Sequence, residues 1–221
     1  MAGSTSVKLA YVDGMNATQS SKSSGRRFGS VQQLLCRALA FLEYCVLYGA
    51  ASVLGPSSIV RYLRNPNPRI TVRVLRSFGA SIGSQTTIKG GVIVDNVERD
   101  ANSTGDFSHL KIGSNCYIGE SVFFDLANEI IIQNNAVISG GVSFVTHAEC
   151  RRSSYLSSKF PRKCAPIFVG SGAWVGFRAT ILPGVRVGSN SVIGAHSLLL
   201  RDSEPQCVFI GSPARKLKQI E

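Results

Sequence analysis

The sequence lacks the residue spacings that build metal and redox sites. It has six cysteines and three histidines in 221 residues, and no two cysteines have the Cys-x-x-Cys spacing of zinc and redox motifs. We therefore expect no metal site and six reduced thiols, as in a cytosolic protein. The first thirty residues also lack an apolar core segment of the secretory type. The expected location is the cytoplasm, with the inner membrane surface as the alternative.

Acidic residues are scarce as well. Thirteen Asp and Glu face 24 Lys and Arg, which gives a formal net charge of +11. This excess favours a polyanionic partner: nucleic acid, an anionic membrane surface or a phosphorylated small molecule. Nucleic acid is the weakest of the three, because the sequence lacks the interleaved aromatic and basic residues of a base-stacking surface.

The N-terminal third has two parts of different composition. Residues 1–30 are rich in Ser, Gly and basic residues, and we predict that they are disordered. Residues 31–70 are predicted to form an apolar helical segment and a linker. The run 31–54 is long enough to lie on a membrane, but Arg37 and Glu43 would be costly at bilayer depth. Packing on the rest of the protein is favoured, and a peripheral membrane contact is the alternative.

From residue 80 onward an aliphatic or Phe residue returns every six positions, in five groups of three. A helix would repeat near 3.6 and a strand near 2. The fifteen leading positions are Ile82, Ile88, Val94; Ile112, Ile118, Phe124; Ile132, Ile138, Phe144; Val169, Val175, Ile181; and Val187, Ile193, Leu199.

The period of six predicts a coil of three short strands joined by tight corners. The groups begin 30, 20, 37 and 18 residues apart, so one coil takes 18 residues and loops enter between some coils. Coils that bury their edges on their neighbours make a stable stack. We predict an all-β left-handed parallel β-helix over residues 71–221, with loops 95–111 and 148–166.

Several motifs of the C-terminal half stand in a familiar order. The stretch "APIFVGSGAWVGFRATILPGVRVGSNSVIGAHSLLLRD", followed by "VFIGSPARKLK", resembles the hexapeptide-repeat acyltransferases. The resemblance covers roughly residues 75–219 and is strongest to the galactoside, maltose and xenobiotic acetyltransferases and the sugar O-acetyltransferases. It implies acetyl-CoA as co-substrate and a homotrimer in which the cofactor groove lies between neighbouring subunits.

The resemblance also implies a catalytic role for His147 in "FVTHAE". A histidine at this place is the general base that takes the proton from the acceptor hydroxyl. A neutral imidazole suits that task near pH 7. His196 is interpreted as a corner residue beside the cofactor groove, and His109 as a solvent-exposed loop residue. The histidines are too far apart to supply the paired zinc ligands of a γ-class carbonic anhydrase.

Other site residues follow from the same resemblance. Asp125 in "VFFD" and Trp174 in "AWVG" are implied to contact the acceptor, as substrate-binding residues. The implied cofactor-binding residues are Phe177, Ala195, Arg201, Arg215 and Lys218. The basic ones suit the phosphates of CoA, whereas Phe177 stands where the family commonly has a small residue.

These features predict an acyl-CoA-dependent O-acyltransferase, with acetyl transfer to a hydroxyl of a sugar or polysaccharide precursor as the preferred reaction. Two alternatives stay open. One is a non-catalytic β-helix that serves as a scaffold or binding module. The other is an N-acetyltransferase of an amino sugar.

Overall fold

The computed structural model describes the backbone of residues 28–221 and the side chains from residue 32 onward. The predicted disorder of residues 1–30 therefore falls, for residues 1–27, outside the described residues. By internal contacts the chain divides into a first unit, Met1–Cys36, and a second unit, Arg37–Glu221. All features below belong to the second unit unless stated.

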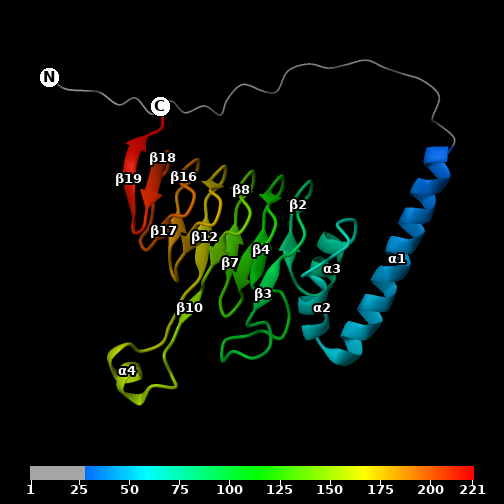
Figure 1. Ribbon diagram of the computed structural model, residues 1–221, viewed down its shortest axis with the longest axis horizontal. Coiled ribbons are helices and arrows are strands. Elements are labelled where there is room, and N and C mark those ends of the chain that lie inside the picture. The colour runs from blue at the N-terminus through cyan, green and yellow to red at the C-terminus, as the bar shows by residue number, and fades with distance from the viewer. Residues whose placement is uncertain (1–27) are drawn as a thin grey trace. The chain divides into compact units, whose positions relative to one another are not determined.

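Short parallel strands wind into a triangular coil whose sides form three sheets (Figure 1). Face A contains β1 (Ser81–Ile82), β4 (Leu110–Ile112), β7 (Ile130–Ile132), β12 (Ile167–Val169) and β15 (Arg186–Val187). Face B contains β2 (Thr87–Ile88), β5 (Tyr117–Ile118), β8 (Val137–Ile138), β13 (Trp174–Val175), β16 (Val192–Ile193), β18 (Cys207–Gly211) and β19 (Ala214–Gln219). Face C contains β3 (Ile93–Asp95), β6 (Phe123–Asp125), β9 (Ser143–Phe144), β14 (Thr180–Ile181) and β17 (Leu198–Leu199).

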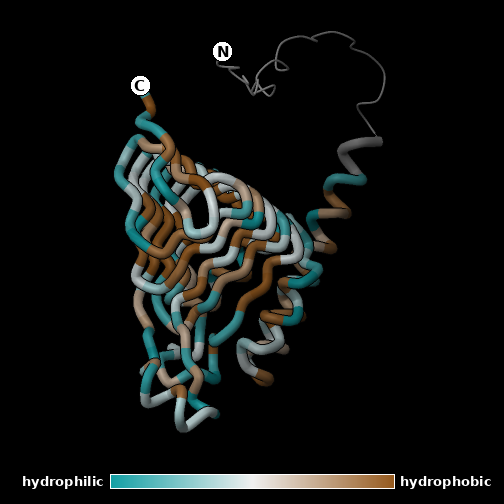
Figure 2. Tube along the Cα trace, turned by 60° about the vertical axis from the view of Figure 1, so that its left-hand side comes forward, coloured by the Kyte–Doolittle hydropathy of each residue, from teal (hydrophilic) through white to brown (hydrophobic). Residues whose placement is uncertain are grey.

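The leading residues of the period face inward and stack from coil to coil. On face B, Ile118 pairs with Ile138, which pairs with Val175 in the next coil. All fifteen leading residues are buried, and the rings of Phe124 and Phe144 stack with their centroids 5.5 Å apart. The apolar strands form a continuous hydrophobic interior (Figure 2). The predicted left-handed parallel β-helix is confirmed.

The stack ends in an antiparallel hairpin. Strand β18 adds to face B in parallel with β16, and β19 then pairs with β18 in the opposite direction. The last strand of face B therefore runs against the direction of the coils.

Within residues 28–221, three helices precede the first coil: α1 (Phe28–Leu54), α2 (Ser57–Tyr62) and α3 (Thr71–Ser77). Ile59, Leu63 and Leu75 are buried and join the same hydrophobic core as the β-helix. The linker expected after the apolar helical segment contains α2, a helix of only six residues. The first strand begins at Ser81, after α3.

Candidate functional site

Both insertions leave the β-helix at one edge, where the chain passes from face C to face A; we call it edge CA. One insertion joins β3 to β4, and the other joins β9 to β12. The second contains a hairpin of β10 (His147–Ala148) and β11 (Lys163–Cys164), and α4 (Ser154–Lys159) at its tip (Figure 1). The opposite edge, where face B turns into face C, has no insertion in any of the five coils, and we call it edge BC.

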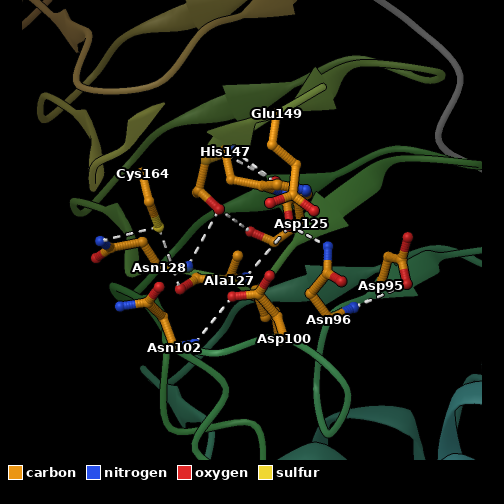
Figure 3. A network of polar contacts seen from close by, with 12 residues as sticks. Asp95, Asn96, Asp100, Asn102, Asp125, Ala127, Asn128, His147, Glu149 and Cys164 are labelled. Carbon is orange, nitrogen blue, oxygen red and sulfur yellow. Dashed lines mark hydrogen bonds and ion pairs between the residues drawn. The ribbon is translucent and has the colours of Figure 1, made fainter. Parts of the chain in front are cut away.

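The side chains of Asp125 and His147 meet at edge CA (Figure 3). Asp125 ends β6, and His147 follows β9 one coil later. His147 Nδ1 lies 2.6 Å from Asp125 Oδ2. A carboxylate only accepts hydrogen bonds, so Nδ1 carries the proton and Nε2 of the neutral ring has the lone pair. Nε2 has no hydrogen-bond partner within residues 32–221.

The same carboxylate is held from several sides. The backbone N–H groups of Thr146 and His147 donate to Oδ2 at 2.8 and 3.0 Å. Asn96 Nδ2 donates to Oδ1 at 2.7 Å, and the backbone N–H of Ala127 donates to the same oxygen at 3.2 Å. The Asp125 side chain is only 1% exposed, whereas the His147 side chain is 24% exposed. The pair thus consists of a buried carboxylate and an accessible imidazole.

These contacts decide the charge of Asp125. Burial raises its pKa, but hydrogen bonds from Asn96 and His147 together outweigh burial and leave the pKa below the ordinary range of an aspartate. Asp125 is therefore ionised at neutral pH. An ionised partner stabilises a protonated imidazole, as a general base becomes when it accepts a proton.

The two insertions are fastened to each other beside this pair. Arg162 donates to both carboxylate oxygens of Asp100, at 2.9 and 2.6 Å, and to Glu149 at 3.2 Å. The hydrogen bonds from Arg162 lower the pKa of Asp100. The Asp100 side chain is 7% exposed and that of Arg162 is 25% exposed, so this ion pair is largely shielded. It holds the loop after His147 against the loop after β3.

The loop after His147 also lines an open cavity of about 560 Å³. This cavity is next to the hairpin that carries His147, because Ala148 and Lys163 of that hairpin line it. Its lining combines apolar side chains with charged side chains of both signs: Ala148, Glu149, Cys150, Leu156, Lys159, Phe160, Pro161 and Lys163.

A second open hollow of about 420 Å³ lies in the same loop and is lined by Glu149, Cys150, Arg151, Arg152 and Ser153. A third hollow, of about 270 Å³, lies on the β-helix, where Phe168 and Arg186 line it, and it is not part of the loop or of the site.

Asp125 occupies a different place from the one expected of a residue that contacts the acceptor. Its carboxylate is buried, and both oxygens accept hydrogen bonds from neighbouring coils. A direct bond to a sugar hydroxyl would need an exposed oxygen, and burial at 1% leaves none. The carboxylate of Asp125 instead accepts a hydrogen bond from the ring of His147.

Phe177, Ala195 and Arg215 come together along edge BC. The backbone N–H of His196, next to Ala195, donates to Phe177 O at 2.8 Å, so the two positions lie on adjacent coils. Arg215 pairs with Ile210 in the final hairpin, and Ile210 lies against Gly194 at the same edge. Three of the implied cofactor residues thus form one row.

The remaining predicted residues lie elsewhere on the same chain. Arg201 follows β17, at the end of edge CA. Trp174 and Lys218 belong to strands of face B, and Trp174 Nε1 donates to Ser139 Oγ at 3.1 Å. One chain alone therefore does not bring Trp174 beside His147, nor Arg201 beside Arg215.

The other two histidines differ in their surroundings. His196 is an exposed corner residue with a φ of 56°, and its ring meets the edge of Phe177 with centroids 5.8 Å apart, as expected for a corner. His109 was expected to be solvent-exposed, but it is half-buried and its Nδ1 lies 2.8 Å from Leu126 O. Within the described residues, no group of three or more His, Cys, Asp or Glu side chains is placed to hold a metal ion.

Sequence reasoning missed the residues that support the pair. Asn96, Thr146, Asp100 and Arg162 were not singled out, although all four lie in or beside the two insertions. A usable signal was present, since Asn96 and Thr146 each follow a leading residue by two positions at the same edge. Stacked coils place equivalent positions next to each other.

Parts of this chain are similar in sequence to known proteins. Residues 166–201 match the family model described as "Bacterial transferase hexapeptide (six repeats)". The galactoside O-acetyltransferase of Escherichia coli (strain K12) is 32% identical over 123 residues, 51% of this chain and 58% of that protein. The aligned parts span from 53 to 64% of the length of such curated relatives, which is less than two thirds.

Solved structures share the fold. A maltose O-acetyltransferase from Clostridium difficile 630 has a TM-score of 0.63 at 23% identity, over 80% of this chain and 89% of that chain. A galactoside acetyltransferase in complex with coenzyme A has a TM-score of 0.56 at 21% identity, over 75% of this chain and 78% of that chain. The predicted resemblance to hexapeptide-repeat acyltransferases is confirmed.

Proposed function

We propose that this protein transfers an acetyl group from acetyl-CoA to a hydroxyl of a sugar or polysaccharide precursor. The observation that carries the proposal is the Asp125–His147 pair, in which a buried carboxylate fixes an accessible imidazole with Nε2 as its basic atom. The relatives named as O-acetyltransferases support the reaction class.

In the proposed reaction His147 acts as general base. Nε2 takes the proton from the acceptor hydroxyl while that oxygen attacks the thioester carbonyl, and the imidazolium then returns the proton to the departing sulfur. Acetyl-CoA supplies the acetyl group as a thioester and leaves as the thiol. Asp125 is a positioning residue, since it touches neither reactant: it holds the ring and stabilises the positive charge that forms on it.

Residues of edge BC suit the cofactor. CoA carries a 3′-phosphate and a pyrophosphate, which guanidinium groups bind well. Arg215 is exposed at the end of this edge, and Phe177 and Ala195 present exposed surface along it. We assign the pantetheine arm to this row and the phosphates to Arg215, with Lys218 on the next part of the same strand.

The active unit in this proposal is a homotrimer. His147 lies at edge CA and the cofactor row at edge BC, so a neighbouring chain has to bring the second edge to the first. Face B supports such packing, because Tyr117, Val137 and Trp174 form an exposed row in register and are 41, 40 and 52% exposed. Closed threefold symmetry repeats this one contact three times. The position of Trp174 near the acceptor then depends on the neighbour.

The acceptor is assigned to the region of the 560 Å³ cavity in the loop after His147. Phe160 offers an apolar surface for a sugar ring, and the polar groups of Glu149 and Lys163 offer partners for hydroxyls. The Arg162–Asp100 ion pair keeps this loop in place.

Calorimetric titration with acetyl-CoA tests the proposal before the acceptor is known. Arg215→Ala should weaken binding about tenfold, because it removes a charge-assisted contact to phosphate. His147→Ala should bind acetyl-CoA as the wild type does. No binding by the folded protein at millimolar acetyl-CoA would contradict the transferase and favour a non-catalytic β-helix. A panel of sugars and amino sugars then separates O-acetylation from N-acetylation.

A further inference from the structure

One face of α1 is apolar, uncharged and exposed. The residues that share this face in the second unit, spaced three or four apart along the helix, are all exposed: Ala38, Leu42, Cys45, Val46, Gly49 and Val53. The side chains of Leu42, Val46 and Val53 are 60, 66 and 84% exposed. Apolar surface of this extent marks an interaction site.

The opposite face of α1 packs on the protein. Ala40 and Ala51 are buried in the common core, and Tyr44 Oη lies 2.8 Å from Ser77 Oγ of α3. By length and composition alone, Gln32–Leu54 could cross a membrane, with a mean hydropathy of 1.5. Since one side of the helix is already packed on α3, a position along a surface fits better than a span.

The charge of Glu43 does not lie on the apolar face of α1, so it does not hinder a contact with lipid. Its carboxylate points toward the protein, where Tyr62 Oη and Asn67 Nδ2 donate to it at 3.0 and 2.7 Å. Burial first of all, and the neighbouring Glu43 carboxylate in addition, raise the pKa of Tyr62 to about 12. The tyrosine therefore stays a hydrogen-bond donor, and Glu43 stays away from the apolar face.

The segment that follows α1 is basic, although the exposed carboxylate of Glu98 lies beside Gly55 and Ser57 at the end of α1. Between Glu43 and Asp95 the sequence has no acidic residue, but it has six cations: Arg61, Arg64, Arg69, Arg73, Arg76 and Lys89. Arg73 lies directly on α1, with its guanidinium carbon 4.0 Å from the ring centroid of Tyr44. The side chains of Arg64 and Arg69 are exposed and make no hydrogen bond or ion pair within residues 32–221.

We propose that this apolar face and the arginines of α2, α3 and their connection dock the protein on an anionic lipid surface. Apolar side chains enter the boundary of the acyl chains while cations bind the headgroups, as in other interfacial helices. A second copy of the chain that presents the same surface in a twofold contact is the less suitable occupant, because it would bring arginines of like charge together. The proposal is independent of the acetyl-transfer reaction.

Co-sedimentation of the full chain with lipid vesicles tests the proposal. One set of vesicles is phosphatidylcholine, and the other contains about 30% phosphatidylserine. We expect binding to the anionic vesicles that weakens with added salt. Replacing Leu42→Gln, Val46→Gln and Val53→Gln together should reduce binding about tenfold or more. Replacing Arg64→Gln and Arg69→Gln should reduce it about fivefold for each arginine at low salt.

Matched controls keep the result specific. Tyr155→Gln removes an exposed aromatic of α4, and Arg152→Gln removes an exposed cation of the same loop; neither should change vesicle binding. Circular dichroism and thermal unfolding show whether each variant is folded.

Three results of the vesicle experiment would overturn the proposal. They are no binding to either vesicle, equal binding to neutral and anionic vesicles, and undiminished binding by the folded triple variant. If the wild type instead forms a larger oligomer that the triple variant does not form, a second copy covers this face and the lipid proposal fails.

Discussion

The two edges of one β-helix differ in almost every property. Edge CA has the insertions, a buried carboxylate, an accessible histidine and the Arg162–Asp100 ion pair. Edge BC repeats the same tight corner in coil after coil, and glycine lets the backbones approach closely there. The regular edge suits an extended ligand that lies along it, and the irregular edge suits chemistry at one point. The comparison teaches that six-residue repeats supply the scaffold, while departures from the repeat supply the candidate reactive groups.

The largest expected difference between the edges concerns two histidines. His147→Gln at edge CA should lower kcat/KM about 10³-fold, since it removes the proposed general base. His196→Gln at edge BC should change kcat/KM less than about threefold, because its ring has only a packing contact with Phe177. Initial rates with acetyl-CoA and a responsive acceptor give both values. A similar loss in both variants would remove the functional distinction.

A smaller effect is expected for the carboxylate behind His147. Asp125→Asn should lower kcat about 10²-fold and leave the Kd of acetyl-CoA unchanged, because the amide cannot orient and stabilise the ring as a carboxylate does. Asp95 is the matched control, since it pairs with Asp125 across one coil but is exposed. Asp95→Asn should retain near wild-type kcat. An equal change in kcat and Kd would indicate a structural role instead.

The close approach of coils at edge BC can be tested through stability. A Cβ added at Gly176 would lie 2.7 Å from the backbone atoms Ala195 N and Ile193 O. Gly176→Ala should therefore lower the free energy of unfolding by about 2–3 kcal/mol. Gly105→Ala, in an open loop near edge CA with a φ of 79°, should cost only about 1 kcal/mol. Chemical denaturation measures both, and a reversed order would contradict the packing argument.

The ion pair between the insertions predicts a dependence on pH. Asp100 has a lowered pKa in the folded protein, so its stabilisation is complete above the unfolded value of about 4 and is lost as pH falls below it. Arg162→Gln should lower the free energy of unfolding by about 1–2 kcal/mol at pH 7 and by less at low pH. Denaturation at several pH values measures this change.

The control for that pair is a nearby surface arginine. Arg151 is 80% exposed and lies 3.8 Å from Glu149, so Arg151→Gln should change stability by less than about 0.5 kcal/mol. If both arginine variants behaved alike at every pH, the shielding of the Arg162–Asp100 pair would have no energetic consequence.

The smallest expected effect lies in the cofactor row of edge BC. Phe177→Ala should raise the KM for acetyl-CoA about threefold, because a half-exposed ring loses only part of its contact area. Phe177→Leu should keep most of the affinity. A change in kcat without a change in KM would place Phe177 outside the cofactor groove.

The fold could be predicted almost completely because its cause is local and repeated. Each leading residue has one place in the period, and the fifteen positions gave fifteen buried side chains. The site was harder, since its members are far apart in sequence. Asn96, Asp125 and His147 meet only because three coils stack in register, and loop lengths differ between those coils. The period predicted that Asp125 lies at an edge of the β-helix. It did not predict that the carboxylate of Asp125 would point inward and contact His147.

The final hairpin has a consequence for self-assembly. A stack of parallel coils offers an open strand at its end, where another molecule could continue the sheet. Strand β19 covers that position on face B in the opposite direction and exposes Arg215, Lys216 and Lys218 along it. A further coil that runs in the same direction can pair with β19 only in the antiparallel sense, and a second molecule arriving with the same strand meets like charge. The hairpin therefore disfavours end-to-end growth of the stack at face B.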